Sequence, residues 1–152
     1  DYNGLSEDEL MLTFKPDYRN RIRKAPKKGV EVKIMGTEAL DDFVRIMHET
    51  GERDGFSTRP KEYFEKILDC MGEDARLYMA YYEGKAIAGT IAIKWGKNVM
   101  KYQYGASSNA HRNVSLQSAA SFTISAETAS IAKIPKIRIT GFGDLSTASA
   151  AI

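Results

Sequence analysis

Apolar and polar positions along the chain predict one strand, two amphipathic helices and a three-stranded meander, in that order. Residues 30–35 alternate between apolar and polar side chains, as a half-buried strand does. Two later segments repeat apolar residues at i, i+3, i+4 and i+7, which is typical of one buried helical face. These residues are Leu40, Phe43, Val44 and Met47 in the first segment, and Phe64, Ile67, Leu68 and Met71 in the second. We expect Thr37 to cap the first helix and Pro60 to begin the second.

Short glycine-containing turns predict that the next three strands are antiparallel. The strands are expected at residues 77–82, 85–95 and 99–104. The turns between them fall at residues 83–84 and 96–98. After a polar loop over residues 105–113, we expect a helix over residues 116–133 and a short strand over residues 136–140.

The first 28 residues predict a basic helical lead-in. Ser6 and Glu9 have the spacing of a capping box before a short apolar run. Residues 15–28 then carry seven basic side chains against a single acid, Asp17, with Pro16 suited to a first helical turn. This cationic helix fits an electrostatic contact with RNA, with phosphate or with an anionic membrane surface. It also fits a solvated helix face, and the residues alone leave both readings open.

Length and composition limit the classes of protein to which the chain can belong. Its 152 residues and 43% hydrophobic content suit one domain. No apolar run is long enough to span a membrane, and the first residues are acidic and polar, so we expect a cytoplasmic protein. A single cysteine, Cys70, leaves no internal disulfide, and the isolated His48 and His111 predict no metal site. The start at Asp1 indicates a piece of something longer.

The charged segment from Gly51 to Phe64 joins the two predicted helices and is the most unusual connection in the chain. It contains two glycines, a Ser-Thr pair and an Arg-Pro step, although a shorter connection would serve. Loops of this kind frequently carry binding or catalytic residues. We therefore expect functional residues here.

The predicted order of elements matches the GCN5-related N-acetyltransferase (GNAT) fold, an α/β (α+β) architecture in which helices flank a mixed sheet. In that fold the sheet splays between its fourth and fifth strands, and the acyl donor enters the gap. A CoA-dependent member would carry Gln/Arg-x-x-Gly-x-Gly/Ala after the third meander strand, where backbone N–H groups bind pyrophosphate. The segment from Tyr104 to Arg112 reads YGASSNAHR and lacks this pattern. We therefore expect neither CoA nor another cofactor.

Five sequence runs resemble the Fem peptidyltransferases, which build interpeptide bridges in bacterial peptidoglycan from aminoacyl-tRNA. They are YRNRIRKAPKKGVEV, ETGERDGFSTRPKEYFEKIL, AIAGTI, KYQYGASSN followed by RN, and GDLS at Gly143. The runs extend over roughly the whole chain and keep the family's spacing. The resemblance implies that residues 29–152 are the second of two acetyltransferase-like domains, without its C-terminal strands. Between Val114 and Phe142 the sequence departs from the family.

The resemblance implies an aminoacyltransferase of cell-wall synthesis. Its donor would be aminoacyl-tRNA, and its acceptor the lysine-type side-chain amine of a muramoyl pentapeptide linked to UDP or to a lipid. It would act in the cytoplasm, at the inner face of the membrane where it makes a peripheral contact. Two rival functions remain: a non-catalytic module that binds tRNA or membrane, and a CoA-dependent N-acetyltransferase.

Three residues at the start of the second helix are candidates for binding the acceptor. Its diphosphate suits a guanidinium, which can bind phosphate through two hydrogen bonds. Arg59 precedes the helix, Tyr63 lies one turn further on the same side, and Phe64 is adjacent. The resemblance implies that all three face the nucleotide-sugar part of the acceptor. The residues alone also allow Arg59 to pair with an acid such as Glu62, and Phe64 to serve only in the core.

Tyr104 ends the third meander strand and is the fourth candidate for substrate binding. Family members place a tyrosine here near the acceptor. Its phenol could donate a hydrogen bond to the acceptor or to a developing oxyanion. The alternative is a tyrosine that only covers the sheet, and Tyr102 is expected on the same face of the strand.

No residue is an evident general base, so the catalytic residues stay unassigned. Asp54 could assist proton transfer, but together with Glu52 and Arg53 it equally suggests an ionic cluster that fixes the loop. His48 flanks the first helix, and His111 lies in a loop without a carboxylate to orient it. An aminoacyl ester is already activated, so positioning the amine supplies much of the rate.

Overall fold

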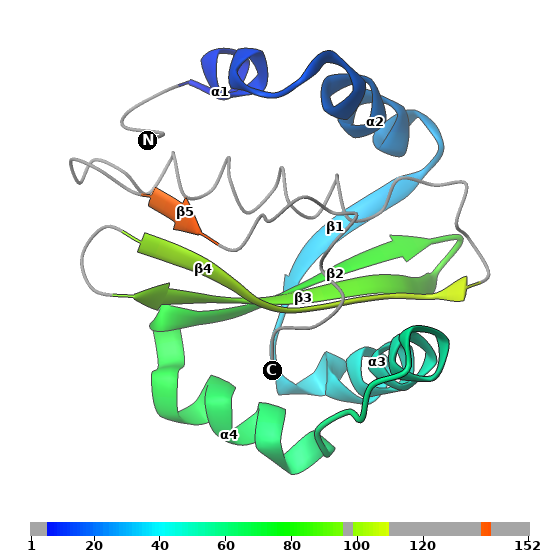
Figure 1. Ribbon diagram of the computed structural model, residues 1–152, viewed down its shortest axis with the longest axis vertical. Helices are drawn as coiled ribbons and strands as arrows, with labels where there is room; N and C mark the ends of the chain where they lie inside the picture. Colours follow the sequence, from blue (N-terminus) through cyan, green and yellow to red (C-terminus); the bar gives the residue numbers. More distant parts are fainter. Residues whose placement is uncertain (1–5, 96–98, 110–137, 141–152) are drawn as a thin grey trace.

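The computed structural model describes residues 6–95, 99–109 and 138–140, and Figure 1 shows how their helices and strands are arranged. The helices are α1 (Glu7–Thr13), α2 (Pro16–Lys27), α3 (Leu40–Asp54) and α4 (Lys61–Met71), with the short 3₁₀ helices η1 (Thr37–Ala39) and η2 (Gly72–Asp74). The strands are β1 (Val30–Met35), β2 (Ala75–Tyr82), β3 (Lys85–Trp95), β4 (Val99–Ser107) and β5 (Arg138–Thr140).

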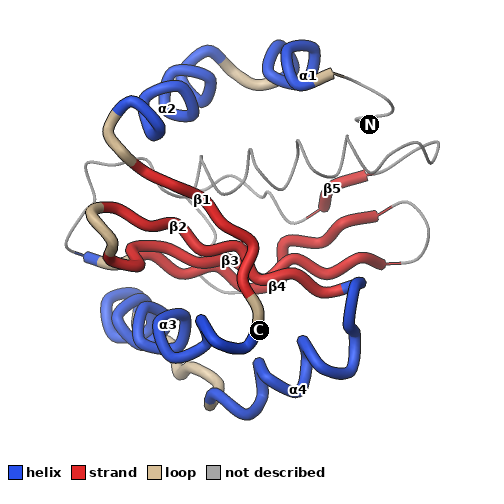
Figure 2. The backbone as a smooth tube through the Cα atoms, turned by 180° about the vertical axis from the view of Figure 1, so that it is seen from behind, coloured by secondary structure: helices blue, strands red, loops and turns tan. Residues whose placement is uncertain are grey.

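The described strands form one mixed sheet in the order β1-β2-β3-β4-β5. Strands β1 to β4 are antiparallel to their neighbours, and β5 runs parallel to β4 beside residues 99–101. Helices α3 and α4 cover one face of the sheet, while α1 and α2 lie on the other side. Both views show this arrangement (Figure 1 and Figure 2). The predicted mixed sheet flanked by helices is confirmed.

The main hydrophobic core lies between the sheet and helices α3 and α4. Phe43 of α3 and Phe64 of α4 are buried there, and their rings meet edge to face with centroids 5.2 Å apart. Leu77 and Met79 of β2 and Ile91 of β3 form the opposite wall. The apolar spacing therefore identified the helical faces that pack on the sheet.

The N-terminal elements agree with the pattern of the sequence. Helix α1 begins with the predicted capping box, in which Ser6 and Glu9 each accept a hydrogen bond from the other's backbone N–H. Helix α2 begins at Pro16 and continues through Pro26 in its last turn. The lead-in is thus two separate helices, and the second one carries the positive charge.

Helix α3 departs from the prediction at both ends. Thr37 does not cap it, because the 3₁₀ turn η1 begins at Thr37 and Ala39 occupies the cap position without a side-chain acceptor. At its other end α3 continues to Asp54, so the first four residues of the predicted loop, 51–54, are helical. The connection to α4 is therefore short and contains residues 55–60.

Strand β4 also runs further than predicted. Residues 105–107, expected in a polar loop, continue the strand because they pair with residues 88–90 of β3. Of the predicted final strand, residues 138–140 form β5. The predicted turn at 96–98 and the predicted helix over 116–133 lie outside the described residues.

Gly89 provides a test of how closely α3 packs on the sheet. A Cβ atom on Gly89 would lie 2.6 Å from Cδ2 of Phe43 and 2.7 Å from the Met79 sulfur. We expect Gly89→Ala to overpack the core and to lower the free energy of unfolding by about 1–3 kcal/mol in urea denaturation. Gly36→Ala is the control, because its methyl group would meet only the flexible Glu38 side chain. An equal loss of unfolding free energy in both variants would contradict this packing.

Candidate functional site

The structure brings the four predicted substrate-binding residues together at the start of α4. Arg59 lies in the preceding loop, and Tyr63 and Phe64 lie in the first turn of the helix. Tyr104 reaches them from β4, 41 residues further along the chain than Tyr63. Pro60 fixes the helix start, because it occupies the cap position and its carbonyl accepts the Tyr63 N–H at 3.1 Å.

A line of contacts joins Arg59 to Tyr104 through Tyr63. The guanidinium carbon of Arg59 lies 5.5 Å from the centroid of the Tyr63 ring, within the range of a cation–π contact. The hydroxyl of Tyr63 lies 2.7 Å from that of Tyr104, and either phenol can be the donor. Arg59 is exposed, and within the described ranges it forms no ion pair with Glu62 or another carboxylate. Its guanidinium is therefore open to an anionic ligand.

Phe64 supports the two tyrosines from inside the core. Its side chain is only 1% exposed, whereas Tyr63 is 38% exposed. The Phe64 ring centroid lies 5.5 Å from that of Tyr63 and 5.3 Å from that of Tyr104, both edge to face. Each aromatic pair of this kind contributes about 0.5–1.5 kcal/mol beyond the burial of its area. Phe64 therefore positions the tyrosines, and its ring does not reach the surface.

A β-bulge in β4 decides which tyrosine joins the cluster. Ile91 of β3 pairs with Tyr104, but the next residue, Ala92, pairs with Tyr102, so Gln103 is an extra residue in β4. The extra residue reverses the alternation of side chains. Tyr104 consequently packs with the α3 and α4 core, and Tyr102 packs on the opposite face of the sheet. The expectation that the two tyrosines share a face was wrong.

Tyr102 has a structural environment. It packs with Tyr78 and Met100, and its phenol lies over Gly105, where any Cβ atom would collide with it. Burial raises the pKa of Tyr102, and a hydrogen bond with Thr90 offsets part of that rise. Tyr102 is therefore a suitable structural control for Tyr104.

Tyr104 is held in its neutral form. Burial, the hydrogen bond with Tyr63 and the neighbouring Tyr63 phenol raise the pKa of Tyr104 to about 12. The phenol therefore stays protonated near pH 7 and is a hydrogen-bond donor rather than a base. Because one hydroxyl of the pair donates to the other, the second hydroxyl proton is left for a ligand.

The other candidate groups have partners of their own. Asp54 accepts hydrogen bonds from Nε and Nη2 of Arg53 at 2.8 and 3.0 Å, so these two residues of the expected ionic cluster pair, whereas Glu52 forms no ion pair with the described residues. His48 Nδ1 lies 2.9 Å from the hydroxyl of Thr58. His111 lies outside the described residues. In the part of the chain that the structure describes, no three His, Cys, Asp or Glu side chains gather as a metal site would need.

Sequence reasoning missed a polar clamp by which α3 holds the end of β4. Arg53 donates to the Ser107 carbonyl and to the Asn109 side chain, both at 3.0 Å. Glu49 accepts the Ser108 hydroxyl at 2.8 Å and the Asn109 N–H at 3.3 Å. Burial alone would raise the pKa of Glu49, but these hydrogen bonds and a neighbouring arginine lower it. The only sequence signal was the i,i+4 spacing of Glu49 and Arg53, which places both on one side of the helix.

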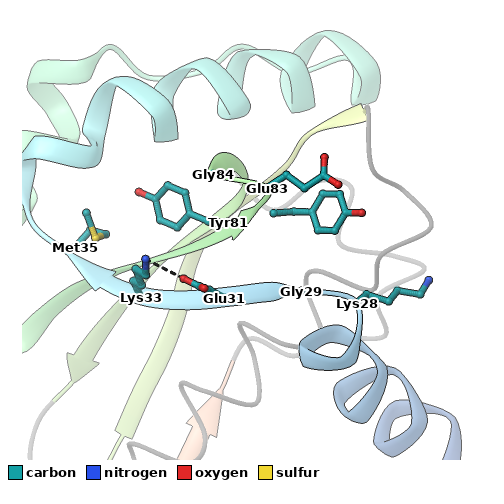
Figure 3. Close-up of a pocket in the computed structure, with 9 residues that line it drawn as sticks. Lys28, Gly29, Glu31, Lys33, Met35, Tyr81, Glu83 and Gly84 are labelled. Atoms are coloured by element: carbon teal, nitrogen blue, oxygen red, sulfur yellow. Dashed lines mark ion pairs between the residues drawn. The ribbon is translucent and has the colours of Figure 1, made fainter.

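Two open grooves on the described surface lie away from the tyrosine cluster. One, of about 620 Å³, follows β1 and the turn between β2 and β3 (Figure 3). In it Lys33 and Glu31 form an ion pair at 2.9 Å, which leaves little net charge. The other, of about 800 Å³, lies beside Arg45 and Ser108. Neither groove is lined by a predicted substrate-binding residue, so the cluster is an accessible patch outside both grooves.

Comparison with known families identifies the chain. The model of the FemAB family matches residues 1–133. The chain belongs to the FemAB family. Lipid II:glycine glycyltransferases are similar to this FemAB chain: that of Staphylococcus epidermidis is 40% identical over 88 residues, which are 57% of this chain and 21% of the relative. That of Staphylococcus aureus is 40% identical over 82 residues, which are 53% of this chain and 20% of the relative. The chain therefore spans about a fifth of the length of the curated relatives it matches.

Solved structures agree with the fold of this FemAB chain. FemX superposes with a TM-score of 0.77 at 21% identity, over 84% of this chain and 48% of FemX. A ribosomal-protein-alanine N-acetyltransferase from Brucella melitensis superposes with a TM-score of 0.56 at 13% identity, over 81% of this chain and 92% of the other. These likenesses confirm the predicted acetyltransferase-type fold.

The hydrogen bond between Tyr63 and Tyr104 predicts a titration result. We expect Tyr63→Phe to lower the pKa of Tyr104 from about 12 towards its ordinary value of 10.0, because the hydrogen bond and the second phenol are lost. Burial should keep it above that value. Carbon-13 NMR of labelled tyrosine rings would follow the titration, with Tyr82→Phe on the opposite face as the control. An unchanged Tyr104 titration in the Tyr63 variant would contradict the contact.

Proposed function

We propose that this FemAB chain belongs to an aminoacyltransferase that moves an amino acid from aminoacyl-tRNA to the side-chain amine of a peptidoglycan precursor pentapeptide. The family match and the staphylococcal relatives, named lipid II:glycine glycyltransferases, support this class of reaction. The observation that carries the proposal is the line of contacts from Arg59 through Tyr63 to Tyr104. It places an open cation and two phenol hydroxyls at one accessible place.

In this proposal Arg59 binds the diphosphate of the acceptor. A planar guanidinium can bind two phosphate oxygens at once, and the Tyr63 ring restricts where the Arg59 group lies. A UDP-linked and a lipid-linked muramoyl pentapeptide share this diphosphate. The name of the relatives favours the lipid-linked form. Phe64 acts indirectly, because it packs behind both tyrosines.

The proposed reaction needs little chemistry from the protein. The acceptor amine attacks the ester carbonyl carbon of aminoacyl-tRNA, a C–N bond forms and the C–O bond to the ribose breaks. The amine loses a proton, and the ribose oxygen takes one up. Negative charge develops on the former carbonyl oxygen, where a neutral phenol of the Tyr63–Tyr104 pair can donate a hydrogen bond. The ester is activated already, so the reaction requires no cofactor.

A lipid-linked acceptor also implies where the protein works. The aminoacyl-tRNA donor is a cytoplasmic molecule, and the acceptor would lie at the inner face of the membrane. The protein would therefore act in the cytoplasm with a peripheral membrane contact, in cell-wall synthesis and the maintenance of cell shape.

Replacing Arg59 tests the acceptor site. We expect Arg59→Ala to weaken binding of a UDP-linked muramoyl pentapeptide by about 1.5–3 kcal/mol, because a hydrogen-bonded charge pair is lost. Isothermal titration calorimetry would measure it on the longest chain that the gene encodes. Lys61→Ala is the matched control, since Lys61 is a cation two residues away that pairs with Asp41 at 2.7 Å. Equal binding by Arg59→Ala and the unmodified protein would contradict the assignment.

The two tyrosines of β4 allow a matched test of the hydrogen-bond donor. We expect Tyr104→Phe to lower kcat about 100-fold, the effect of losing one donor to a developing oxyanion. Tyr102→Phe should leave kcat unchanged, because its phenol lies on the other face of the sheet. The assay measures amino acid transfer from charged tRNA. Similar kcat values in the two variants would show that Tyr104 does not supply this hydrogen bond.

A further inference from the structure

Net positive charge is concentrated around helix α2, and the rest of the chain has a net negative charge. Residues 15–28 hold seven of the 22 basic residues and only one of the 20 acidic residues. The remaining sequence therefore has 15 basic against 19 acidic residues and is net negative. An asymmetry of this kind indicates an anionic partner at the basic segment.

Arg19, Arg23 and Lys27 form a stripe along α2. They follow one another at i,i+4, so they share one side of the helix and span about 12 Å along its axis. Arg23 and Lys27 are exposed, and Arg19 is half-buried. None of the three forms an ion pair with a carboxylate of the described residues. The stripe therefore presents three cations whose charge no carboxylate of the described residues neutralises.

The inner side of α2 is already occupied by the protein. Ile22 and Ala25 are buried, and Ala25 packs with Val30, Ala80 and Ile87 of the sheet. The helix lies on the face of the sheet opposite α3 and α4 (Figure 1). The cations thus project from a helix that is held in place, with no free apolar face among its described residues.

We propose that the Arg19–Arg23–Lys27 stripe binds the phosphodiester backbone of RNA. A helix that lies in a membrane surface inserts an apolar face, and the apolar side of α2 is buried in the protein. None of the described helices is long and apolar enough to cross a bilayer. A single phosphate would be met by converging groups, whereas these cations are distributed along a line. A linear polyanion matches that distribution, and guanidinium forks suit its phosphate oxygens.

The identification of this RNA as tRNA rests on the proposed function. The inference that the stripe binds RNA does not rest on it. Helix α2 lies on one side of the sheet and α4 on the other (Figure 1). The stripe belongs to α2, and the Arg59 cluster lies at the start of α4. The stretch of RNA backbone bound by the stripe would therefore lie away from the acceptor site. Variants in one region should leave binding at the other unchanged, so the two proposals can fail independently.

The salt dependence of RNA binding tests the stripe. Fluorescence anisotropy would measure the affinity of the full chain for deacylated tRNA at several KCl concentrations. The test variant is Arg19→Gln/Arg23→Gln/Lys27→Gln. The control is Lys33→Gln/Lys61→Gln/Lys94→Gln, which removes the same charge from three lysines that pair with carboxylates. Each lost phosphate contact lowers the slope of log K against log[KCl] by about one, so we expect a reduction of about two to three in the test variant only.

Several outcomes would overturn this inference. Equal slopes for the two triple variants would show that only net charge matters. Loss of binding to phosphatidylglycerol-containing vesicles, with tRNA binding unchanged, would assign the stripe to a membrane. Absence of tRNA binding by the unmodified protein would also reject it. The single variant Arg23→Gln, with an expected slope change of about one, serves if the triple variant does not fold. Arg59→Ala should leave the salt dependence of tRNA binding as it is in the unmodified protein. This holds whether or not the protein binds the acceptor.

Discussion

The extra residue at Gln103 is the constraint on which the arrangement of the site depends. A regular β4 would project Tyr102 and Tyr104 from the same face of the sheet. The bulge places Tyr102 on the face of the sheet opposite α3 and α4, beside Thr90, and turns Tyr104 towards α4, where its hydroxyl meets that of Tyr63. The strand pairs with β3 on both sides of the bulge, so the change of direction is local. One inserted residue thus brings Tyr104 of β4 into contact with Tyr63 of α4, which is distant in the sequence.

The packing of the core explains why this contact is held in place. Phe64 lies between the buried Phe43 and the two tyrosines, so the helix that carries Tyr63 is fixed by the same ring that fixes Tyr104. At the end of β4, Glu49 and the other clamp residues of α3 tie the strand down a few residues beyond Tyr104. The tyrosine pair is therefore supported from the core and from the end of its strand. Sites built on packed elements of this kind hold their geometry better than sites on free loops.

Local periodicity predicted much of the fold, and contacts between distant segments account for the rest. The helical spacing of Phe43 and Phe64 identified the buried faces, since that signal depends only on neighbours in the sequence. The segment from Tyr102 to Tyr104 reads as regular alternation, and only its register with β3 reveals the bulge. The loop was predicted to begin at Gly51, but α3 continues to Asp54. The charged and glycine residues of this last turn resemble those of a loop. The site residues came from the family resemblance, whereas their mutual contacts required the structure.

We propose that the protein transfers an amino acid from tRNA rather than an acetyl group from CoA. Mass spectrometry of the acceptor tests this most directly. A muramoyl pentapeptide would be incubated with the longest chain the gene encodes, together with either a pool of aminoacyl-tRNAs or acetyl-CoA. We expect a gain in mass of one amino acid residue that requires the charged tRNA. A gain of one acetyl group that requires CoA, or no modification with either donor, would contradict it.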